Sequence, residues 1–236
     1  MIASQLSFDL RPRTWGGARE GAGRKRIKGR SDPAHRERPE HRAYHPVHVV
    51  LRTRPDVPRL RRGEVLRSIR KALQRAAHRS DFRVVHVSIQ HNHLHLIVEA
   101  TTKLGLSRGM QGFAIAAARA INNSLERRGK VFAFRYHSTT ITNPRQARHA
   151  LAYVLNNWRR HREDERGEQQ RNALVDPYSS GVVFDGWREV SSFALPENYV
   201  PLPVARAQTW LLRTGWELGG PKISVRERPG RLGSQG

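Results

Sequence analysis

Apolar and polar side chains alternate along residues 81–100 of the chain. Leu94 and Leu96 fall on one side of this pattern, and His93 and His95 fall on the other. A period of two places successive side chains on opposite faces of a β-strand. We therefore expect strand structure over the whole stretch, either as two strands joined by a tight hairpin or as one long strand.

Three other stretches have apolar positions at the spacing of an amphipathic helix, at residues 65–76, 107–128 and 144–158. Asn143 and Pro144 predict the start of the third helix. An asparagine side chain caps a first helical turn well, and a proline at the first position loses no hydrogen bond there.

The order of these elements indicates the fold class. Residues 45–52 and 131–141 have strand-like patterns, and Gly129 stands where a glycine would end the second helix. The chain then runs strand, helix, strand, strand, helix, strand, followed by a third helix. This order predicts an α+β fold of ferredoxin-like type, in which an antiparallel sheet carries helices on one face.

Composition divides the chain into three parts. Residues 1–43 are rich in glycine, proline and arginine, which predicts a flexible basic arm that contacts phosphates or merely aids solubility. Residues 44–163 hold the periodic elements. Residues 164–236 predict an extension of loops, one short helix near 209–216 that packs on the domain or contacts DNA, and a disordered tail from Arg226.

The charge of the chain favours a nucleic acid as its partner. Lysine and arginine number 43 against 20 aspartates and glutamates, a formal net charge of +23. Basic side chains that neutralise phosphates release counterions, which drives binding to a polyanion. A membrane surface is a weaker alternative, because no segment is apolar for long enough to span a bilayer. The N-terminus lacks a signal segment, so we expect a cytoplasmic protein.

The histidine pair is the first candidate for chemistry. His93 and His95 lie about 6–7 Å apart along one strand face, a geometry that can hold one divalent metal ion. The chain has no cysteine, which excludes zinc–thiolate sites and thiol nucleophiles. In a chain with 12 histidines, an ordinary surface pair is the alternative. Glu99 shares the face, but it lies at the limit of reach for a ligand.

The third helix carries the second candidate. His149, Tyr153, Asn157 and His161 follow one another at intervals of four residues, which stacks them one turn apart. This arrangement is either an active-site face or an ordinary helix flank, and the spacing alone leaves both open.

These motifs together resemble a known family. His93-Leu94-His95 resembles the His-hydrophobic-His motif of the HUH superfamily, and the segment from Tyr153 to Asn157 is similar to the single-tyrosine motif of IS200/IS605-like transposases. REP-associated tyrosine transposases are the subgroup that it resembles most. The resemblance covers about residues 44–163. Trp158 departs from it, because a proline usually follows the asparagine, and this favours a helix that runs on without a kink.

The resemblance implies a DNA transposase with endonuclease activity on single-stranded or hairpin DNA. His93 and His95 would bind Mg²⁺ or Mn²⁺, with Asn157 as a third ligand through oxygen. Tyr153 would attack the phosphate and form a covalent 5′-phosphotyrosine link. A homodimer and a monomer are equally compatible with the sequence.

Other residues are candidates for contact with DNA. Tyr136 is either a rival nucleophile or a side chain that positions DNA, and Arg108 and Gln111 would meet phosphate at the start of the second helix. The full set of DNA-binding candidates is Arg108, Gln111, Arg135, Tyr136 and His149.

Three rival interpretations remain. The histidine-triad nucleotide hydrolases alternate histidine with apolar residues, and Asn92 breaks that alternation. The letters His-Asn-His also occur in HNH nucleases, whose signature residues are dispersed through a different fold. The more serious alternative is a non-catalytic DNA- or RNA-binding regulator on the same fold, which would never link covalently to its nucleic acid.

Overall fold

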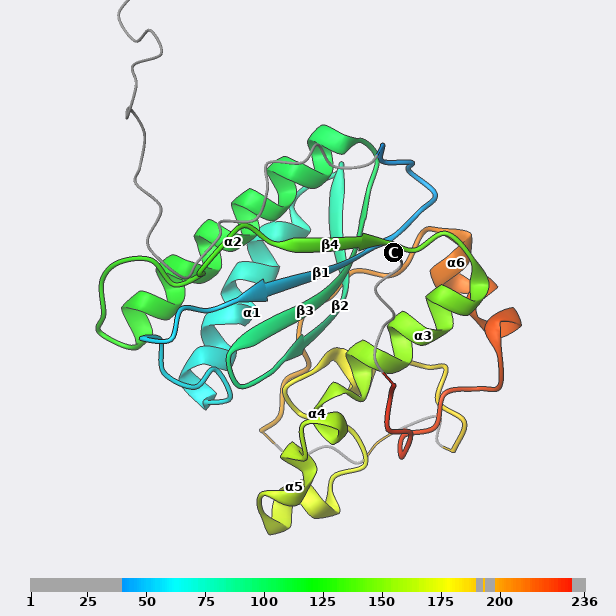
Figure 1. Ribbon diagram of the computed structural model, residues 1–236. Helices are drawn as coiled ribbons and strands as arrows, with labels where there is room; N and C mark the ends of the chain where they lie inside the picture. The colour runs from blue at the N-terminus through cyan, green and yellow to red at the C-terminus, as the bar shows by residue number, and fades with distance from the viewer. Residues whose placement is uncertain (1–39, 190–192, 194–197, 231–236) are drawn as a thin grey trace, which may run out of the picture. The chain divides into compact units, whose positions relative to one another are not determined.

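A computed structural model describes residues 40–189, 193 and 198–230 (Figure 1). The predicted basic arm lies outside the described residues except for its last four positions. The described chain forms a four-stranded antiparallel sheet in the order β2-β3-β1-β4. Its strands are β1 (Val47–Arg52), β2 (Phe82–Ile89), β3 (His93–Ala100) and β4 (His137–Thr140).

The hairpin alternative for residues 81–100 is correct. The backbone N–H of Gln90 donates to the carbonyl of His93 at 2.9 Å, which closes a tight turn between β2 and β3. β3 then lies between β1 and β2 and is antiparallel to both. This split β-α-β arrangement confirms the predicted ferredoxin-like α+β fold.

Helices α1 (Gly63–Ala77) and α2 (Lys103–Ser124) pack on one face of the sheet, as predicted (Figure 1). The apolar side of β3 faces them, and Leu94 and Leu96 are fully buried there. The alternation of β3 therefore sends its leucines into this core and its histidines to the opposite face.

A second core lies on that opposite face, beneath α3 (Pro144–Leu155). The sheet contributes Val85 and Ile97 to this core. Much of the remainder comes from the C-terminal extension, which adds the buried side chains Val175, Phe184, Trp187, Leu211, Leu212, Trp216, Ile223 and Val225. Both faces of the sheet are thus covered, and the extension is part of the folded core.

Two predicted elements, the helix over 107–128 and the strand over 131–141, have wrong bounds. Helix α2 begins at Lys103, because the side chain of Thr102 caps it by accepting a hydrogen bond from the N–H of Gly105, and it ends at Ser124. Gly129 has a φ of +95° but lies in the loop beyond the helix, so it is not the cap. The predicted strand over 131–141 is reduced to β4.

The residues before β4 still pair with the end of β1 and the turn after it, but this pairing is interrupted between Ala133 and His137, so it does not extend β4. Arg54 donates its N–H to the carbonyl of Val131, and Ala133 donates to the carbonyl of Arg52, each at 2.9 Å. A single bridge between Thr53 and Phe132 lies among these contacts.

The rest of the described chain is short helices and loops. After α3 come α4 (Asn157–Arg160), α5 (Glu168–Asn172) and α6 (Trp210–Arg213), with 3₁₀ turns η1 (Glu163–Glu165), η2 (Ser180–Val183) and η3 (Gly215–Gly219). Within the described ranges, no helix is both long and apolar enough to cross a membrane.

The short predicted helix near 209–216 packs on the domain. Leu211 and Leu212 of α6 are buried, and Trp216 in η3 is buried beside them. The predicted disordered tail is wrong for residues 226–230, since Glu227 forms a two-point ion pair with Arg148 at 2.6 Å. Residues 231–236 lie outside the described part of the chain.

Candidate active site

Strand β3 brings His93 and His95 together on the face opposite α1 and α2. Both side chains are buried, at 8% and 3% exposure. Although the rings leave the strand two residues apart, they converge, and their Nε2 atoms lie 2.9 Å apart. Two adjacent ligands of an octahedral ion, each about 2.1 Å from it, are about 3.0 Å from one another. The spacing of the two nitrogens therefore fits a shared cation.

The other nitrogen of each ring has its own partner. Nδ1 of His93 lies 2.8 Å from Oδ1 of Asn92 in the hairpin turn. Nδ1 of His95 lies 3.0 Å from Nε2 of His48, a buried residue of β1. Each ring is thus held at its Nδ1 atom, and the two Nε2 atoms face each other.

Burial keeps these imidazoles uncharged. Desolvation lowers the pKa of His48 to about 4. Desolvation, aided by the positive charges of His161 and Arg52, lowers the pKa of His93 to about 4. Burial likewise lowers the pKa of His95 well below its usual range. The neutral ring is the form that ligates a metal, so these rings have the protonation state that a metal ligand needs at neutral pH.

Helix α3 places Tyr153 beside the histidines. The predicted cap is present, since the N–H of Gln146 donates to Oδ1 of Asn143 at 2.9 Å. Tyr153 is half-buried, and its ring centroid lies 5.2 Å from that of His95 and 5.9 Å from that of His48, edge to face. The guanidinium of Arg160 lies 5.9 Å from the centre of the Tyr153 ring. The phenol of Tyr153, the two imidazoles and the guanidinium of Arg160 therefore lie close together.

The expectation that the third helix runs on past Trp158 is wrong. Helix α3 ends at Leu155, and a separate turn, α4, begins at Asn157. The break occurs at Asn156, whose amide donates to the carbonyl of Ser224 at 2.9 Å. Trp158 is fully buried, so this large side chain is held in the interior at the position where a proline usually stands.

Asn157 is fully buried, and neither polar atom of its side chain has a hydrogen-bond partner among the described residues. In the sequence it stands four residues after Tyr153, which contacts His95, and four before His161, whose ring centroid is 5.6 Å from that of His93. A buried amide without partners is costly, so its oxygen is chemically suited to a cation. Within the described residues, no group of three or more histidines and carboxylates is arranged to hold a metal ion.

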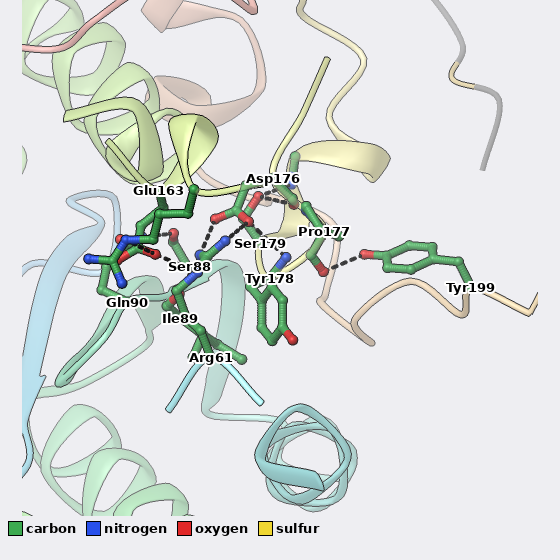
Figure 2. A network of polar contacts seen from close by, with 12 residues as sticks. Arg61, Ser88, Ile89, Gln90, Glu163, Asp176, Pro177, Tyr178, Ser179 and Tyr199 are labelled. Carbon is green, nitrogen blue, oxygen red and sulfur yellow. Dashed lines mark hydrogen bonds and ion pairs between the residues drawn. The ribbon is translucent and has the colours of Figure 1, made fainter. Parts of the chain in front are cut away.

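Sequence reasoning missed the polar network that fixes the hairpin (Figure 2). Arg61, just before α1, forms a two-point ion pair with Asp176 at 2.8 and 2.9 Å and donates to the carbonyl of Ile89 at 2.9 Å. Its guanidinium lies 4.6 Å from the centre of the Tyr178 ring. The N–H of Ile89 also donates to the carbonyl of Tyr178. Segments over 100 residues apart thus hold the turn that leads to His93.

Glu99 serves a different purpose from the histidines on its face. Its carboxylate accepts hydrogen bonds from the backbone N–H groups of Gln208 and Thr209 and from the hydroxyl of Thr209, and it pairs with Arg83 at 3.1 Å. These contacts tie the segment that starts α6 to β3. Glu99 is therefore an anchor for the extension.

Two of the DNA-binding candidates lie away from the histidines. Arg108 and Gln111 are exposed on α2, which covers the opposite face of the sheet. They lie in its second and third turns, so they are not at the helix start where they were predicted to meet phosphate.

The remaining candidates lie on two other elements. His149 is exposed on α3, the helix that carries Tyr153, and Arg135 is exposed just before β4. Tyr136 is half-buried and packs against the core beneath α1 and α2, on the far side of the sheet from Tyr153.

The other three tyrosines have different surroundings. Tyr44 is exposed, and Tyr178 lies against Arg61. The hydroxyl of Tyr199 donates to the carbonyl of Pro177 at 3.0 Å, and burial raises the pKa of this phenol to about 12. None of these environments favours a reactive phenolate beside the histidine pair.

Part of this chain is similar to known proteins. A search among curated proteins found no match. Two similar solved structures are a REP-associated tyrosine transposase bound to a REP hairpin and a candidate transposase from Deinococcus radiodurans R1. The first is 15% identical, with 55% of this chain and 74% of that chain covered and a TM-score of 0.43. The second is 14% identical, with 45% and 87% covered and a TM-score of 0.34.

The family comparison covers the histidine pair, Tyr153 and Asn157. The model of the family described as "Transposase IS200 like" matches residues 42–157. This region starts just before β1, contains His93, His95 and Tyr153, and ends at Asn157. Residues 42–157 therefore form a domain of the IS200-like transposase family.

Proposed function

We propose that this protein is a single-tyrosine transposase of the REP-associated type, which cleaves and rejoins single-stranded or hairpin DNA. The observation that carries the proposal is the edge-to-face contact between Tyr153 and His95, with ring centroids 5.2 Å apart. This contact brings the phenol of Tyr153, the proposed nucleophile, close to a pair of nitrogens whose spacing fits one cation.

The nitrogens and one amide would hold the cofactor. His93 and His95 would bind Mg²⁺ or Mn²⁺ through Nε2, and the unpartnered amide of Asn157 would add an oxygen. When bound, such an ion neutralises charge on the scissile phosphate. Two imidazoles with oxygen donors and water are compatible with either metal.

Tyr153 is the proposed nucleophile. Its phenol loses a proton, and the phenolate oxygen bonds to phosphorus as the bond from phosphorus to the 3′ oxygen breaks. That oxygen takes up a proton and leaves as a free 3′-OH, while the 5′ phosphate stays on the tyrosine. A 3′-OH from another strand can reverse the step, which rejoins DNA without an external energy source.

Positive charge around the site supports a DNA substrate. Arg160 lies next to the Tyr153 ring, where it favours the negative charge of the attacking group and of the phosphate. The whole-chain charge of +23 supports binding of the rest of the strand. Arg135 and His149 remain candidates for strand contacts, as do the more distant Arg108, Gln111 and Tyr136.

A denaturing gel tests the proposal directly. Full-length protein is incubated with Mn²⁺ and hairpin DNA labelled at the 5′ or the 3′ end, using Tyr153→Phe and, as a matched control, Tyr136→Phe. We expect an adduct that survives detergent, carries only the label downstream of the cut and disappears in Tyr153→Phe alone. An adduct that persists in Tyr153→Phe would remove this residue from the role.

A non-catalytic regulator is the second candidate function. The observation in its favour is that, within the described residues, no third histidine or carboxylate is arranged with the pair so as to hold a metal ion. Tight hairpin binding by the wild-type protein with no adduct over a broad panel of hairpins would support the regulator and refute the transposase mechanism.

A further inference from the structure

We infer that His48 and Asn92 are positioning residues for the metal site, which hold His95 and His93 in the tautomers and ring orientations that a cation needs. This inference rests on the proposed function, because it concerns the same pair of histidines. The inference assigns a function to His48 and Asn92, which are neither metal ligands nor the nucleophile in the proposed mechanism.

Asn92 determines the proton position on His93. Its Oδ1 lies 2.8 Å from Nδ1 of His93, and an amide oxygen can only accept a hydrogen bond. The ring proton of neutral His93 therefore resides on Nδ1. The lone pair of His93 is left on Nε2, the atom that faces His95.

The hydrogen bond between His48 and His95 can run in either direction, depending on which ring nitrogen carries the proton. Without a cation, Nε2–H of His48 donates to Nδ1 of His95, and Nε2–H of His95 donates to Nε2 of His93. Each ring then carries one proton, and every contact has one donor and one acceptor. In this arrangement His93 and His95 are hydrogen-bonded to each other through their Nε2 atoms.

A cation requires the second arrangement. Nε2 of His95 must then present its lone pair, so the ring proton moves to Nδ1 and is donated to Nε2 of His48. His48 in turn carries its own proton on Nδ1. A hydrogen bond to the far nitrogen of a ligating histidine fixes its tautomer and orientation and typically changes metal affinity by about 10–100-fold.

The packing of His48 fits this role. It is only 5% exposed on a central strand, where an apolar side chain would cost less to bury. Its ring stacks on that of His95 with centroids 5.2 Å apart and an interplanar angle of 18°. It also meets Tyr153 edge to face at 5.9 Å, so it supports the ligand and the nucleophile together.

Calorimetric titration of the full chain with MnCl₂ tests the inference, with four variants. His48→Leu removes the acceptor, and His48→Gln restores an amide acceptor. Asn92→Ala removes the acceptor at an exposed turn, where the fold tolerates the change, and Asn92→Asp keeps one. We expect the Leu and Ala variants to lose about 10–100-fold in affinity and the Gln and Asp variants to stay within a few-fold of wild type.

NMR of protein labelled with ¹⁵N-histidine shows which ring nitrogen of His95 carries the proton. A purely structural role of His48 and Asn92 would not make this tautomer depend on the metal. We expect His95 to carry its proton on Nε2 without metal and on Nδ1 with saturating Mg²⁺. Wild-type affinity in both His48→Leu and Asn92→Ala, or an unchanged His95 tautomer, would overturn the inference. The adduct assay tests the proposed function separately. If the wild-type protein forms the adduct but His48→Leu and Asn92→Ala bind Mn²⁺ as tightly as wild type, the positioning role is refuted and the proposed function stands.

Discussion

Arg61 and Asp176 are 115 positions apart in the sequence, yet they form a two-point ion pair beneath the hairpin that leads to His93. The side chain of Asp176 is fully buried and that of Arg61 is 10% exposed. Four segments meet at this pair, because Arg61 also binds the carbonyl of Ile89 and lies 3.6 Å from Glu163.

We predict that Asp176→Ala lowers the free energy of unfolding by about 3–5 kcal/mol, because it removes the two-point partner of a buried guanidinium and leaves it only the longer contact with Glu163. Urea unfolding at neutral pH measures the change. The control is Asp56→Ala, which removes the partner of Arg54 and Arg127 at an exposed position and should leave the midpoint nearly unchanged. Equal shifts in the two variants would contradict a special role for the buried pair.

Asn157→Leu should stabilise the protein in metal-free buffer while abolishing its response to Mn²⁺. Removing a buried amide that lacks partners relieves a desolvation cost of about 1–3 kcal/mol. Thermal unfolding with and without MnCl₂ measures both effects. Asn156→Leu is the matched control, because it breaks the bond to the carbonyl of Ser224 and should destabilise the protein. A lower melting temperature for Asn157→Leu in metal-free buffer would show that its amide has a structural partner.

Arg160→Gln should slow cleavage about tenfold in single-turnover experiments with saturating DNA, because it removes the cation beside the Tyr153 ring. Arg145→Gln removes an equal charge from an exposed position on α3. We expect both variants to weaken DNA binding slightly and only Arg160→Gln to slow the chemical step. Equal rates for the two variants would assign Arg160 to binding alone.

His86 should make the fold sensitive to acid. Burial lowers the pKa of this ring to about 4, and the ring contacts the hydroxyl of Ser180 at 3.1 Å. The unfolded chain binds its proton near the ordinary pKa of 6.5, so stability is fully present above that pH and falls as the pH drops toward 4. At pH 5 the loss from this residue should be about 1–2 kcal/mol.

The difference in unfolding free energy between wild type and His86→Gln, measured in urea at pH 7, 6 and 5, isolates this contribution. The titration of the other histidines and the carboxylates cancels in the difference. A difference that does not change with pH would mean that His86 is already solvated in the folded protein.

The sheet and its two faces could be predicted because local patterns encode them. The alternation in β3 separates Leu94 and Leu96 from His93 and His95, and Asn143 with Pro144 marks the start of α3. Such signals depend only on neighbours in the chain.

The remaining features depend on partners that are distant in the sequence. Nothing near Arg61 indicates Asp176, and nothing near His95 indicates that His48 would stack on it across the strand pair. No local signal in the sequence marks the break after α3, because no proline stands there; the helix ends where the Asn156 amide donates to the carbonyl of Ser224, a distant residue.

The second core has a consequence for where an independently stable fragment of this chain can end. Residues 42–157 supply α3 and the sheet, but the side chains that cover them come largely from beyond residue 163, including Trp187, Trp216 and Ile223. A fragment that stopped at residue 163 would expose the apolar side chains of Val85 and Ile97 to water. The region matched by the family and the extension therefore form one folding unit.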